Sequence, residues 1–576
     1  MTQTRSFLLI AWLFLAGWLW LQWTEFNAAP AVAPAAGNVA VPAVAANGTG
    51  VAGTAAAIPV PSGGALPAAG APGVVPAVEA AAASSVVRLR NDVLELEIDS
   101  RGALVGSRLI GYREKKKDGS PEVRLLQVSP QGMFTATSGL MAVDAAGRTQ
   151  ILEASFQPVG AEREFALGDG SPSLRVPLQW TDAASGLRVT RTLVLDRGSY
   201  LLRIEDQYAN TGPAARVVYP FVQLARTAPP APSKWEGFTN PESFSFVGAA
   251  WYTPDGSFNK TPFADYEDET PPTGDVADGW IGMLQHHFFV AWVPTAGEKQ
   301  LISTATDATS GAPVYYIRSV AAGLDLAPGA QAVRQARLWV GPKLQKPLEA
   351  VAPGMKLALD YGLFTFISQP LFDYVLTPLH KLTGNWGWAI ILTVLLLKLA
   401  MYPLSAAQFK SMAKLRAVQP RIEALKERYG EDRQAFQMAM MELYKKEKIN
   451  PVGGCLPLLI QMPIFFALYW VLLETVELRH APWMGWIQNL TAPDPYFILP
   501  VLNLAVMYIT QKMTPTPGMD PLQKKMMTAM PLVFGVMMAL FPSGLVLYWV
   551  TNGLLGIAQQ WWITKQHGHR AIPAPH

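Results

Sequence analysis

Cysteine is nearly absent from this chain of 576 residues, with Cys455 as its single example. One cysteine excludes an intrachain disulfide framework and a cysteine-rich metal site. The seven histidines leave little material for a metal centre, because three of them fall in the last ten residues. A net charge of +3 is too small to indicate nucleic acid as a principal partner. We therefore predict no metal, no cofactor and no nucleic acid sequence recognition.

Catalytic motifs are missing as well. The chain has no G-x-S-x-G nucleophile elbow, no H-E-x-x-H zinc motif and no phosphate-binding loop. Its one histidine pair, His286-His287, lies between Leu284 and Phe288, and we interpret both histidines as strand residues rather than ligands. Sequence alone cannot pair two of the many Asp and Glu residues across a cleft. We predict that the chain is not an enzyme.

Charge is scarce, at 15% of residues against 50% hydrophobic, and its distribution is uneven. The apolar excess lies in residues 7–23 and in nearly everything after 385, which indicates an integral membrane protein with a soluble portion between. Phe7–Trp23 follows Arg5 and could be a cleaved signal peptide, since residues 31–33 resemble a cleavage site. We favour a retained anchor with a cytoplasmic N-terminus, because the apolar run is long and three tryptophans would form an interfacial belt at its outer end.

The soluble portion has two parts that differ in amino-acid composition. Residues 28–85 are almost entirely Ala, Pro, Val and Gly, which predicts an extended, mostly disordered tether. From Val86 to about Pro342 apolar and polar residues alternate, as in Leu94–Ile98 and around Leu202 and Ile204. Turns are predicted at Asp118-Gly119, Arg197-Gly198 and Asp255-Gly256. This pattern indicates one large antiparallel β sandwich.

The remaining chain predicts a membrane bundle. Leu359–Leu382 is amphipathic and fits a helix in the membrane interface. The expected spans after it are 385–404, Pro451–Glu477, Tyr496–Lys512, Met526–Leu540 and Leu545–Ile563. With the anchor these make six spans.

Orientation follows from the loops. Residues 408–450 hold ten Lys or Arg, whereas the loops at 478–495 and 541–544 hold only Arg479. By the positive-inside bias both termini lie in the cytoplasm and the β domain lies outside, which is the periplasm in a bacterium. Leu404–Tyr429 and Asp432–Lys448 are helical in pattern and broken at Gly430, which predicts an antiparallel cytoplasmic hairpin. Its charges are a solvated face or a basic arm that docks acidic partners or lipid headgroups.

Lys398 is the only charge in the span 385–404. An ammonium there costs roughly 2.5–3.5 kcal/mol on insertion scales, which favours a functional position facing a polar cavity. The alternative is that its long stem snorkels to the inner interface.

Other polar residues in the spans form a pattern with Lys398. Tyr548, Asn552 and Gln559 fall on one helical face running inward. Each polar residue alone could form an interhelical hydrogen bond worth about 0.6 kcal/mol. Together they predict a wet groove open to the cytoplasm and closed outside by bulky residues such as Trp386, Trp388 and Phe541. The predicted groove residues are Lys398, Gln461, Gln511, Tyr548, Trp549, Asn552 and Gln559.

Methionine is abundant here, with fifteen of the twenty residues between Met401 and Met538. Met is often packing filler, but this density also suits an adaptable surface for varied apolar partners. We predict a slide for client helices beside the groove, comprising Met462, Phe465, Met527, Met530 and Phe534.

Several stretches resemble the YidC membrane protein insertase family of Gram-negative type. In the membrane part they are MYPLS (401–405), NPVGGCLPLLIQMPIFFALY (450–469), DPYFILP (494–500) and FPSGLVLYW (541–549). In the β part they are GAAWYTPD (248–255), MLQHHFFVAWVP (283–294) and LWVGP (338–342). The resemblance implies a five-helix core with a hydrophilic groove, a cytoplasmic helical hairpin and a β-supersandwich similar in fold to sugar mutarotases.

The chain departs from that family at two groove positions. The groove charge is typically arginine, whereas Lys398 stands at the matching position and lacks the bidentate fork of a guanidinium. One turn earlier, Val394 stands where relatives can carry a hydroxyl residue. The tail after Trp562 is short, which weakens a ribosome-docking role for the C-terminus.

Residues and resemblance together predict a multi-domain insertase and folding chaperone of the bacterial inner membrane. Its expected partners are nascent membrane proteins, ribosome-nascent chain complexes, Sec translocon components and the lipid bilayer. Because the chain has no nucleotide-binding motif, we expect the free energy for insertion to come from burial of the client's apolar helix. An ion- or proton-coupled transporter using Lys398 is the alternative, although we see no inverted repeats. A sugar-acting ectodomain enzyme rests on fold analogy only.

The predicted domains follow the chain in order. They are an anchor at 1–27, a tether at 28–85, a periplasmic β domain at 86–342, a connector with the interfacial helix at 343–384, the second transmembrane helix at 385–404, the cytoplasmic hairpin at 405–450, transmembrane helices three to six at 451–565 and a short tail at 566–576.

Overall fold

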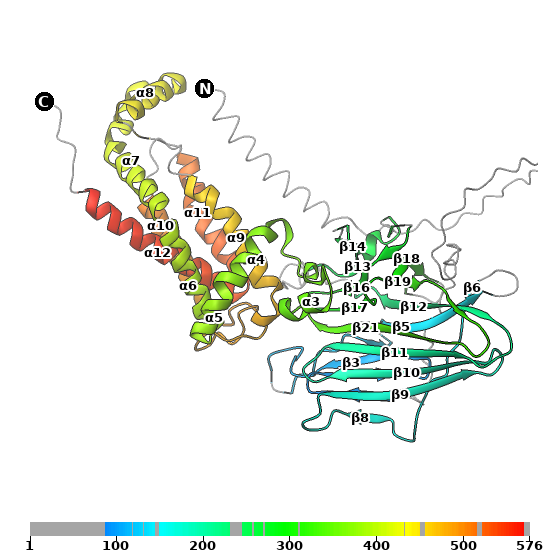
Figure 1. The fold of residues 1–576 in the computed structure, drawn as a ribbon. Coiled ribbons are helices and arrows are strands. Elements are labelled where there is room, and N and C mark those ends of the chain that lie inside the picture. The colour runs from blue at the N-terminus through cyan, green and yellow to red at the C-terminus, as the bar shows by residue number, and fades with distance from the viewer. Residues whose placement is uncertain are drawn as a thin grey trace, which may run out of the picture. The chain divides into compact units, whose positions relative to one another are not determined.

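The computed structural model describes residues 87–568 except 118, 131, 144–148, 231–244, 256–257, 269–270, 273, 309–311, 431, 448, 450–455 and 515–520. The predicted anchor and tether, and most of the predicted tail, lie outside the described residues. The described chain consists of a β region followed by a helical region, which are coloured blue to green and green to red in Figure 1.

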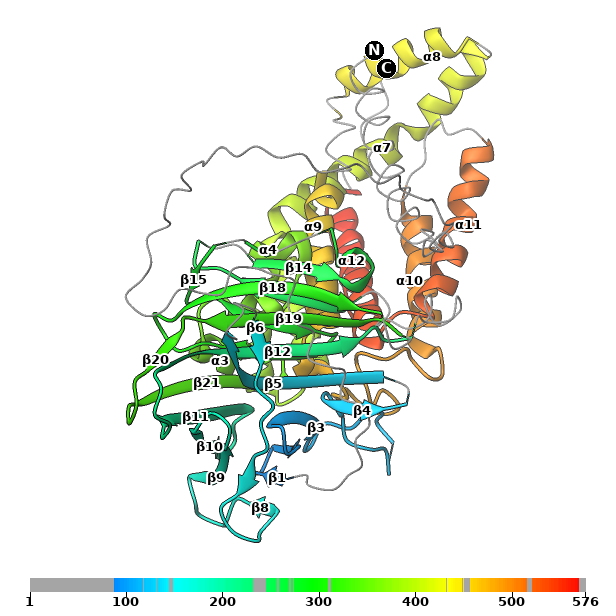
Figure 2. The same ribbon diagram turned by 90° about the vertical axis from the view of Figure 1, so that its right-hand side faces the viewer.

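The first sheet forms because alternating residues give each strand one apolar face. Leu94, Leu96 and Ile98 of β2 are buried while the two glutamates between them are not, as predicted. Figure 2 shows β18, β19, β12 and β5 side by side in this sheet. Its strands in spatial order are β15 (Val276–Ala277), β18 (Lys299–Asp307), β19 (Val314–Ala321), β12 (Arg216–Thr227), β5 (Gly132–Val143), β3 (Ala103–Leu109), β2 (Leu94–Ile98), β1 (Val87–Arg90) and β8 (Glu164–Ala166), with β20 (Leu324–Leu326), β4 (Gln127–Ser129) and β6 (Thr149–Ile151) paired at its sides.

The second sheet has nine strands in the described chain. Its order is β14 (Phe258–Pro262), β13 (Gly248–Tyr252), β16 (Trp280–Leu284), β17 (Phe288–Val293), β21 (Gln331–Pro342), β11 (Leu201–Asn210), β10 (Leu187–Asp196), β9 (Ser173–Asp182) and β7 (Gln157–Pro158). Among the described strands the pairings are antiparallel except that β1 runs parallel to β8. These two sheets confirm a large β-sheet domain.

A buried arginine of the second sheet links the two sheets. Arg191 of β10 donates to both carboxylate oxygens of Asp206 at 2.8 Å, and its guanidinium also reaches Ser138 O in β5 of the other sheet. Because buried charges require partners, this pair fixes one register between the layers.

The predicted turns agree where they are described. Arg197 and Gly198 form a turn with Gly198 at φ +66°, a left-handed conformation that glycine adopts readily. Asp118 and Gly256 lie outside the described residues. The interpretation of His286 and His287 as strand residues is wrong, because both lie in the connection between β16 and β17.

The helical region begins with short elements after β21. They are α3 (Gln345–Val351), η3 (Met355–Ala358), η4 (Gly362–Phe364), α4 (Thr365–Leu371), η5 (Phe372–Leu376, a π-helix) and α5 (Thr377–Thr383). The predicted amphipathic helix over Leu359–Leu382 is therefore helical from Gly362 onward and continuous only from Thr365. Gly384, at φ +66°, ends it.

The longer helices follow. They are α6 (Trp386–Ala400), α7 (Tyr402–Tyr429), α8 (Arg433–Lys446), α9 (Leu456–Glu474), η7 (Val476–Leu478), α10 (Ile498–Met513), α11 (Pro521–Met538) and α12 (Ser543–Gly568). The prediction of one continuous span over 385–404 is wrong, because the chain bends by 68° between α6 and α7. Pro403, near the start of α7, lacks the amide hydrogen that a continuous helix would use there.

By length and mean hydropathy, none of the described helices qualifies singly as a membrane span, although α6 and α7 qualify together across their bend. Ile460–Glu474, Ile498–Met513 and Lys525–Met538 are shorter apolar helices.

Helices α7 and α8 form the predicted hairpin. Gly430 ends α7, and the Asp432 side chain caps α8 by accepting from the amides of Gln434 and Ala435. A small apolar core joins the two helices, comprising Val418, Ile422, Tyr444 and Ile449. The hairpin is thus held by its own packing.

Candidate functional site: a polar cluster between helices α6 and α12

The Lys398 ammonium lies against α12 at a glycine. A Cβ added at Gly556 would stand 3.8 Å from Lys398 Nζ, so the absence of a side chain there leaves room for the lysine head. Asn552 and Gln559 flank Gly556 on the same face of α12, at one turn on either side. No carboxylate pairs with Lys398 among the described residues. The structure therefore places Lys398 beside the face that carries two of the other predicted groove residues.

Gln559 adds an unsatisfied acceptor to this cluster. Its Oε1 atom is buried and has no hydrogen-bond partner among the described residues. A buried amide oxygen without a donor costs free energy unless water or another molecule supplies the donor. The arrangement suits a site that is wet or that receives a polar group.

Gln461 and Tyr548 form a second cluster along α12. Gln461 Nε2 donates to the Tyr548 hydroxyl at 2.8 Å, which joins α9 to α12. The ring of Phe465 packs against Trp549 with centroids 5.0 Å apart and against Tyr548 at 6.2 Å. This aromatic group lies nearer the start of α12 than Lys398 does, and it fills the space between α9 and α12.

Gln511 lies apart from both clusters. Its side-chain amide donates to the backbone carbonyl of Met527 and so joins α10 to α11. A close approach of α10 to α12 depends on Gly553, because an added Cβ there would stand 2.3 Å from Val506 Cγ1. The structure thus brings together most of the predicted groove residues along α12, but not Gln511.

The predicted slide residues divide by exposure. Met530 is exposed, whereas Met462, Met527 and Phe534 are half-buried, and half-buried Phe465 packs in the aromatic group. Helix α11 has an exposed apolar face, of which only Met530 was among the predicted slide residues. The face comprises Met526, Met530, Leu532, Val533 and Val536. The helical period of these residues is the signal that would have found it.

A buried charge cluster at the C-terminal end of α9 was not predicted either. Lys343 and Glu474 have side chains only 2% and 3% exposed, with Nζ and Oε2 3.9 Å apart. Ser245 Oγ donates to Glu474 Oε1 at 3.0 Å, and His286 Nε2 lies 3.9 Å from the same oxygen. These contacts join the β domain to the end of a membrane helix. The sequence signal for this cluster was Glu474, an acidic residue at the end of an apolar run. Its partners could not be inferred, because they lie over a hundred positions away in the sequence.

The two histidines of this cluster are neutral. His286 Nε2 must donate to Leu473 O, 2.9 Å away, because a carbonyl only accepts. Burial, helped by the charge of Lys343, lowers the pKa of His286 to about 3. Burial likewise lowers the pKa of His287 well below its usual range, and the two rings stack with centroids 3.7 Å apart. Burial also lowers the pKa of Lys343, while the charge of Glu474 opposes that shift.

A second set of contacts attaches the β domain to the 478–490 loop. Arg479 donates to the backbone carbonyls of Arg113 and Glu114 at 2.7 and 2.9 Å. Lys116 donates in the opposite direction, to the carbonyls of His480 and Gln488. Each cation satisfies peptide oxygens of the other element, which stabilises the pairing of these two loops.

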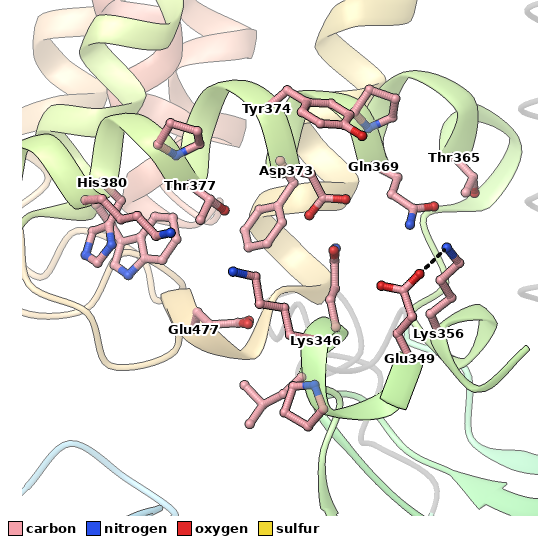
Figure 3. Close-up of a pocket in the computed structure, with 18 of the residues that line it drawn as sticks. Lys346, Glu349, Lys356, Thr365, Gln369, Asp373, Tyr374, Thr377, His380 and Glu477 are labelled. Carbon is pink, nitrogen blue, oxygen red and sulfur yellow. Dashed lines mark hydrogen bonds and ion pairs between the residues drawn. The ribbon is translucent and has the colours of Figure 1, made fainter. Parts of the chain in front are cut away.

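A cleft of about 1140 Å³ lies between α3 and the α4–α5 helices, away from the predicted groove residues. Figure 3 shows Asp373, Thr377 and Glu477 facing this space, with Lys346 among them. No group of three or more His, Cys, Asp or Glu is placed to hold a metal ion in the part of the chain that the structure describes.

The chain is similar to known protein families and to individual relatives. Residues 378–570 match a family described as 60Kd inner membrane protein, and residues 86–374 match one described as YidC periplasmic domain. A membrane protein insertase YidC of Stenotrophomonas maltophilia is 49% identical over 589 residues, covering 100% of this chain and 98% of that protein. One from Xanthomonas euvesicatoria is 48% identical over 585 residues, with coverages of 99% and 98%.

A solved structure is also similar. It is described as an active YidC insertase crystal structure with the first transmembrane domain resolved, and it shares 19% identity at a TM-score of 0.36. The match covers 83% of this chain and 94% of that one.

Proposed function

Because this chain belongs to the YidC family of membrane protein insertases, we propose that it passes client segments through a hydrophilic groove along α12. It is an inner-membrane protein with a periplasmic domain, and it is an insertase rather than an enzyme. The proposed topology has six spans with both termini in the cytoplasm, so that the α7–α8 hairpin projects to the side where clients arrive.

The observation that carries the groove is the environment of Lys398. Its ammonium lies beside Gly556 with no carboxylate partner among the described residues, near the unsatisfied Gln559 Oε1. A cation in low dielectric attracts an acidic group strongly, at about 4 kcal/mol for contact at an effective dielectric constant of 20. An acidic flank of a client would supply the partner that the chain itself does not. Asn552 would add hydrogen bonds in the same groove. Gln461 on α9, with Tyr548 and Trp549 near the start of α12, would extend the groove. Gln511 would contribute where α10 meets α11.

The apolar part of the client would leave over the exposed face of α11. That face is rich in methionine and branched aliphatic side chains, which adapt to different helix surfaces. The drive is burial of the client's apolar helix in lipid, at about 25 cal/mol per Å². The membrane potential would add about 2.3 kcal/mol per charge per 100 mV.

Substitution of Lys398 tests the proposal. Lys398→Arg should insert clients nearly normally, Lys398→Ala should impair clients with acidic translocated segments by roughly tenfold, the equivalent of 1.4 kcal/mol, and Lys398→Glu should be worst. The assay measures insertion of paired clients that differ in one translocated Asp. Equal insertion of both clients by the wild type and Lys398→Ala would remove the electrostatic groove. Damage by Lys398→Arg equal to that by Lys398→Ala would instead favour proton coupling, because arginine does not release its proton.

The hairpin would recruit clients, ribosome-nascent chain complexes or the Sec translocon. It is basic, and its two helices carry their own apolar core, so it can act as a separate docking arm. Deletion of 405–448 should abolish insertion in cells while the remaining helices still reach the membrane, which protease protection can verify. Normal insertion by the deletion variant would reduce the hairpin to a spacer.

A further inference from the structure

The cleft beside α3 contains two buried oxygen atoms that lack hydrogen-bond partners. Glu477 Oε2 and Thr377 Oγ1 are both buried without a hydrogen-bond partner among the described residues, and both residues line the cleft. Asp373 lines it as well, close enough to Glu477 for the two negative charges to oppose each other. Figure 3 shows these three residues around one space, contributed by η5, α5 and η7. A cationic donor would satisfy the buried oxygens and offset the repulsion between the two carboxylates.

The same cleft also contains cations. Lys346 and Lys381 line it, and neither forms a direct ion pair among the described residues, although Lys346 interacts electrostatically with Asp373 at longer range. Lys356 differs, because its Nζ lies 3.1 Å from Glu349 Oε1 and is therefore already paired. Lysine ammonium groups are general partners for phosphate. The cleft thus offers partners for a positive and a negative group of one ligand.

The rim of the cleft is apolar and unusually exposed. Phe366 and Tyr374 line it at 73% and 81% exposure, and Leu382 on the same helical run is 78% exposed. An amphipathic helix with such a face lies at a membrane interface, and the family of this chain is an inner-membrane family. The ligand therefore has an obvious source in the bilayer.

We propose that this cleft binds the headgroup of a zwitterionic aminophospholipid. Its ammonium would contact Glu477, Asp373 and Thr377, and its phosphate would contact Lys346 and Lys381. A primary ammonium has three N–H donors for the unsatisfied oxygens, whereas a trimethylammonium has none. The site therefore selects ethanolamine over choline headgroups, and it disfavours glycerol headgroups, which bring no cation to the carboxylates.

Native mass spectrometry of the full chain in detergent tests this binding. The probe is an equimolar mixture of phosphatidylethanolamine, phosphatidylcholine and phosphatidylglycerol with identical acyl chains. The ethanolamine lipid should be retained about tenfold over either competitor, as expected for a charge-assisted hydrogen bond. Glu477→Gln and Asp373→Asn should each remove most of that preference. Glu349→Gln is the matched control, because it neutralises a carboxylate that is 66% exposed and already paired in the same cleft.

Two further arms decide the source of the ligand. Glycerophosphoethanolamine should compete only at far higher concentration than the lipid; equal affinity of the soluble headgroup would overturn the assignment to a bilayer ligand. Equal retention of the three lipids, or an unchanged preference in Glu477→Gln, would overturn the site. Thr377→Val provides the same comparison should Glu477→Gln fail to fold, and the thermal unfolding midpoint of each variant establishes that it is folded.

Discussion

Two lysines, one buried and one half-buried, show how differently the two regions of this molecule treat charge. At the junction of the β domain with α9, the buried Lys343 lies beside Glu474 and near the stacked pair His286-His287. In the membrane helices, Lys398 lies beside a glycine with polar neighbours and no carboxylate partner among the described residues. One cation is satisfied by the chain, and the other is left for something outside it.

A charge that stabilises the fold can be distinguished from a charge kept for function by whether the chain supplies its partner. A buried charge with a partner contributes to a specific arrangement, and loss of one partner is costly because the other stays buried. A charge that the fold leaves unpaired contributes little stability, so its retention needs another reason.

Removal of the Lys343 charge should lower the free energy of unfolding more than removal of the Lys398 charge. Lys343→Met leaves Glu474 buried without its cation and should destabilise the protein by about 3 kcal/mol. Lys398→Met should change stability by less than about 1 kcal/mol or increase it, since it removes an intramembrane charge. Chemical unfolding in detergent measures both. Recovery in Lys343→Met combined with Glu474→Gln would confirm the pairing; equal effects of the two single variants would contradict the comparison.

Acid should weaken the junction selectively. The pKa of His286 is held at about 3 by burial, so the unfolded chain, with an ordinary pKa near 6.5, binds the proton more readily. Stability is therefore complete above about pH 6.5 and is lost as pH falls toward 3. At pH 5 the loss from this group should approach about 2 kcal/mol. Arg479 and Lys343 oppose protonation further.

The measurement is the unfolding midpoint of the full chain at pH 7.5 and at pH 5. His286→Asn should reduce the difference between the two midpoints, because asparagine keeps a donor for Leu473 O and does not titrate. An undiminished acid response in His286→Asn and in His287→Asn would show that the histidine pair is not the sensitive element.

Removal of the whole β domain should have the smallest effect on insertion. A chain with the anchor joined to Leu359 loses Lys343 and His286, but it also exposes Glu474 to water, so no charge is left buried and unpaired. The proposed groove residues all lie beyond Leu359. Client insertion in cells should stay largely intact. Failure of insertion in a membrane-localised truncation would make the β domain part of the mechanism.

Much of the architecture followed from periodicity. Alternation in Leu94–Ile98 and around Ile204 specified strands because one face of each had to be buried. The helix break at Gly430 and the polar face of α12 were predicted from the same local rules. The bend between α6 and α7 was missed, because an apolar run does not reveal where its axis changes direction.

Local patterns in the sequence were therefore enough to predict a β region followed by helices, the family resemblance and the position of Lys398 in an apolar run. Only the tertiary structure decided which side chains meet. It placed Lys398 at Gly556, paired Gln461 with Tyr548, moved Gln511 to Met527 and joined Lys343 to Glu474 across 131 positions. Such contacts depend on how whole elements pack, and hydrophobic burial, which drives that packing, is non-directional and carries no local pattern from which partners could be inferred.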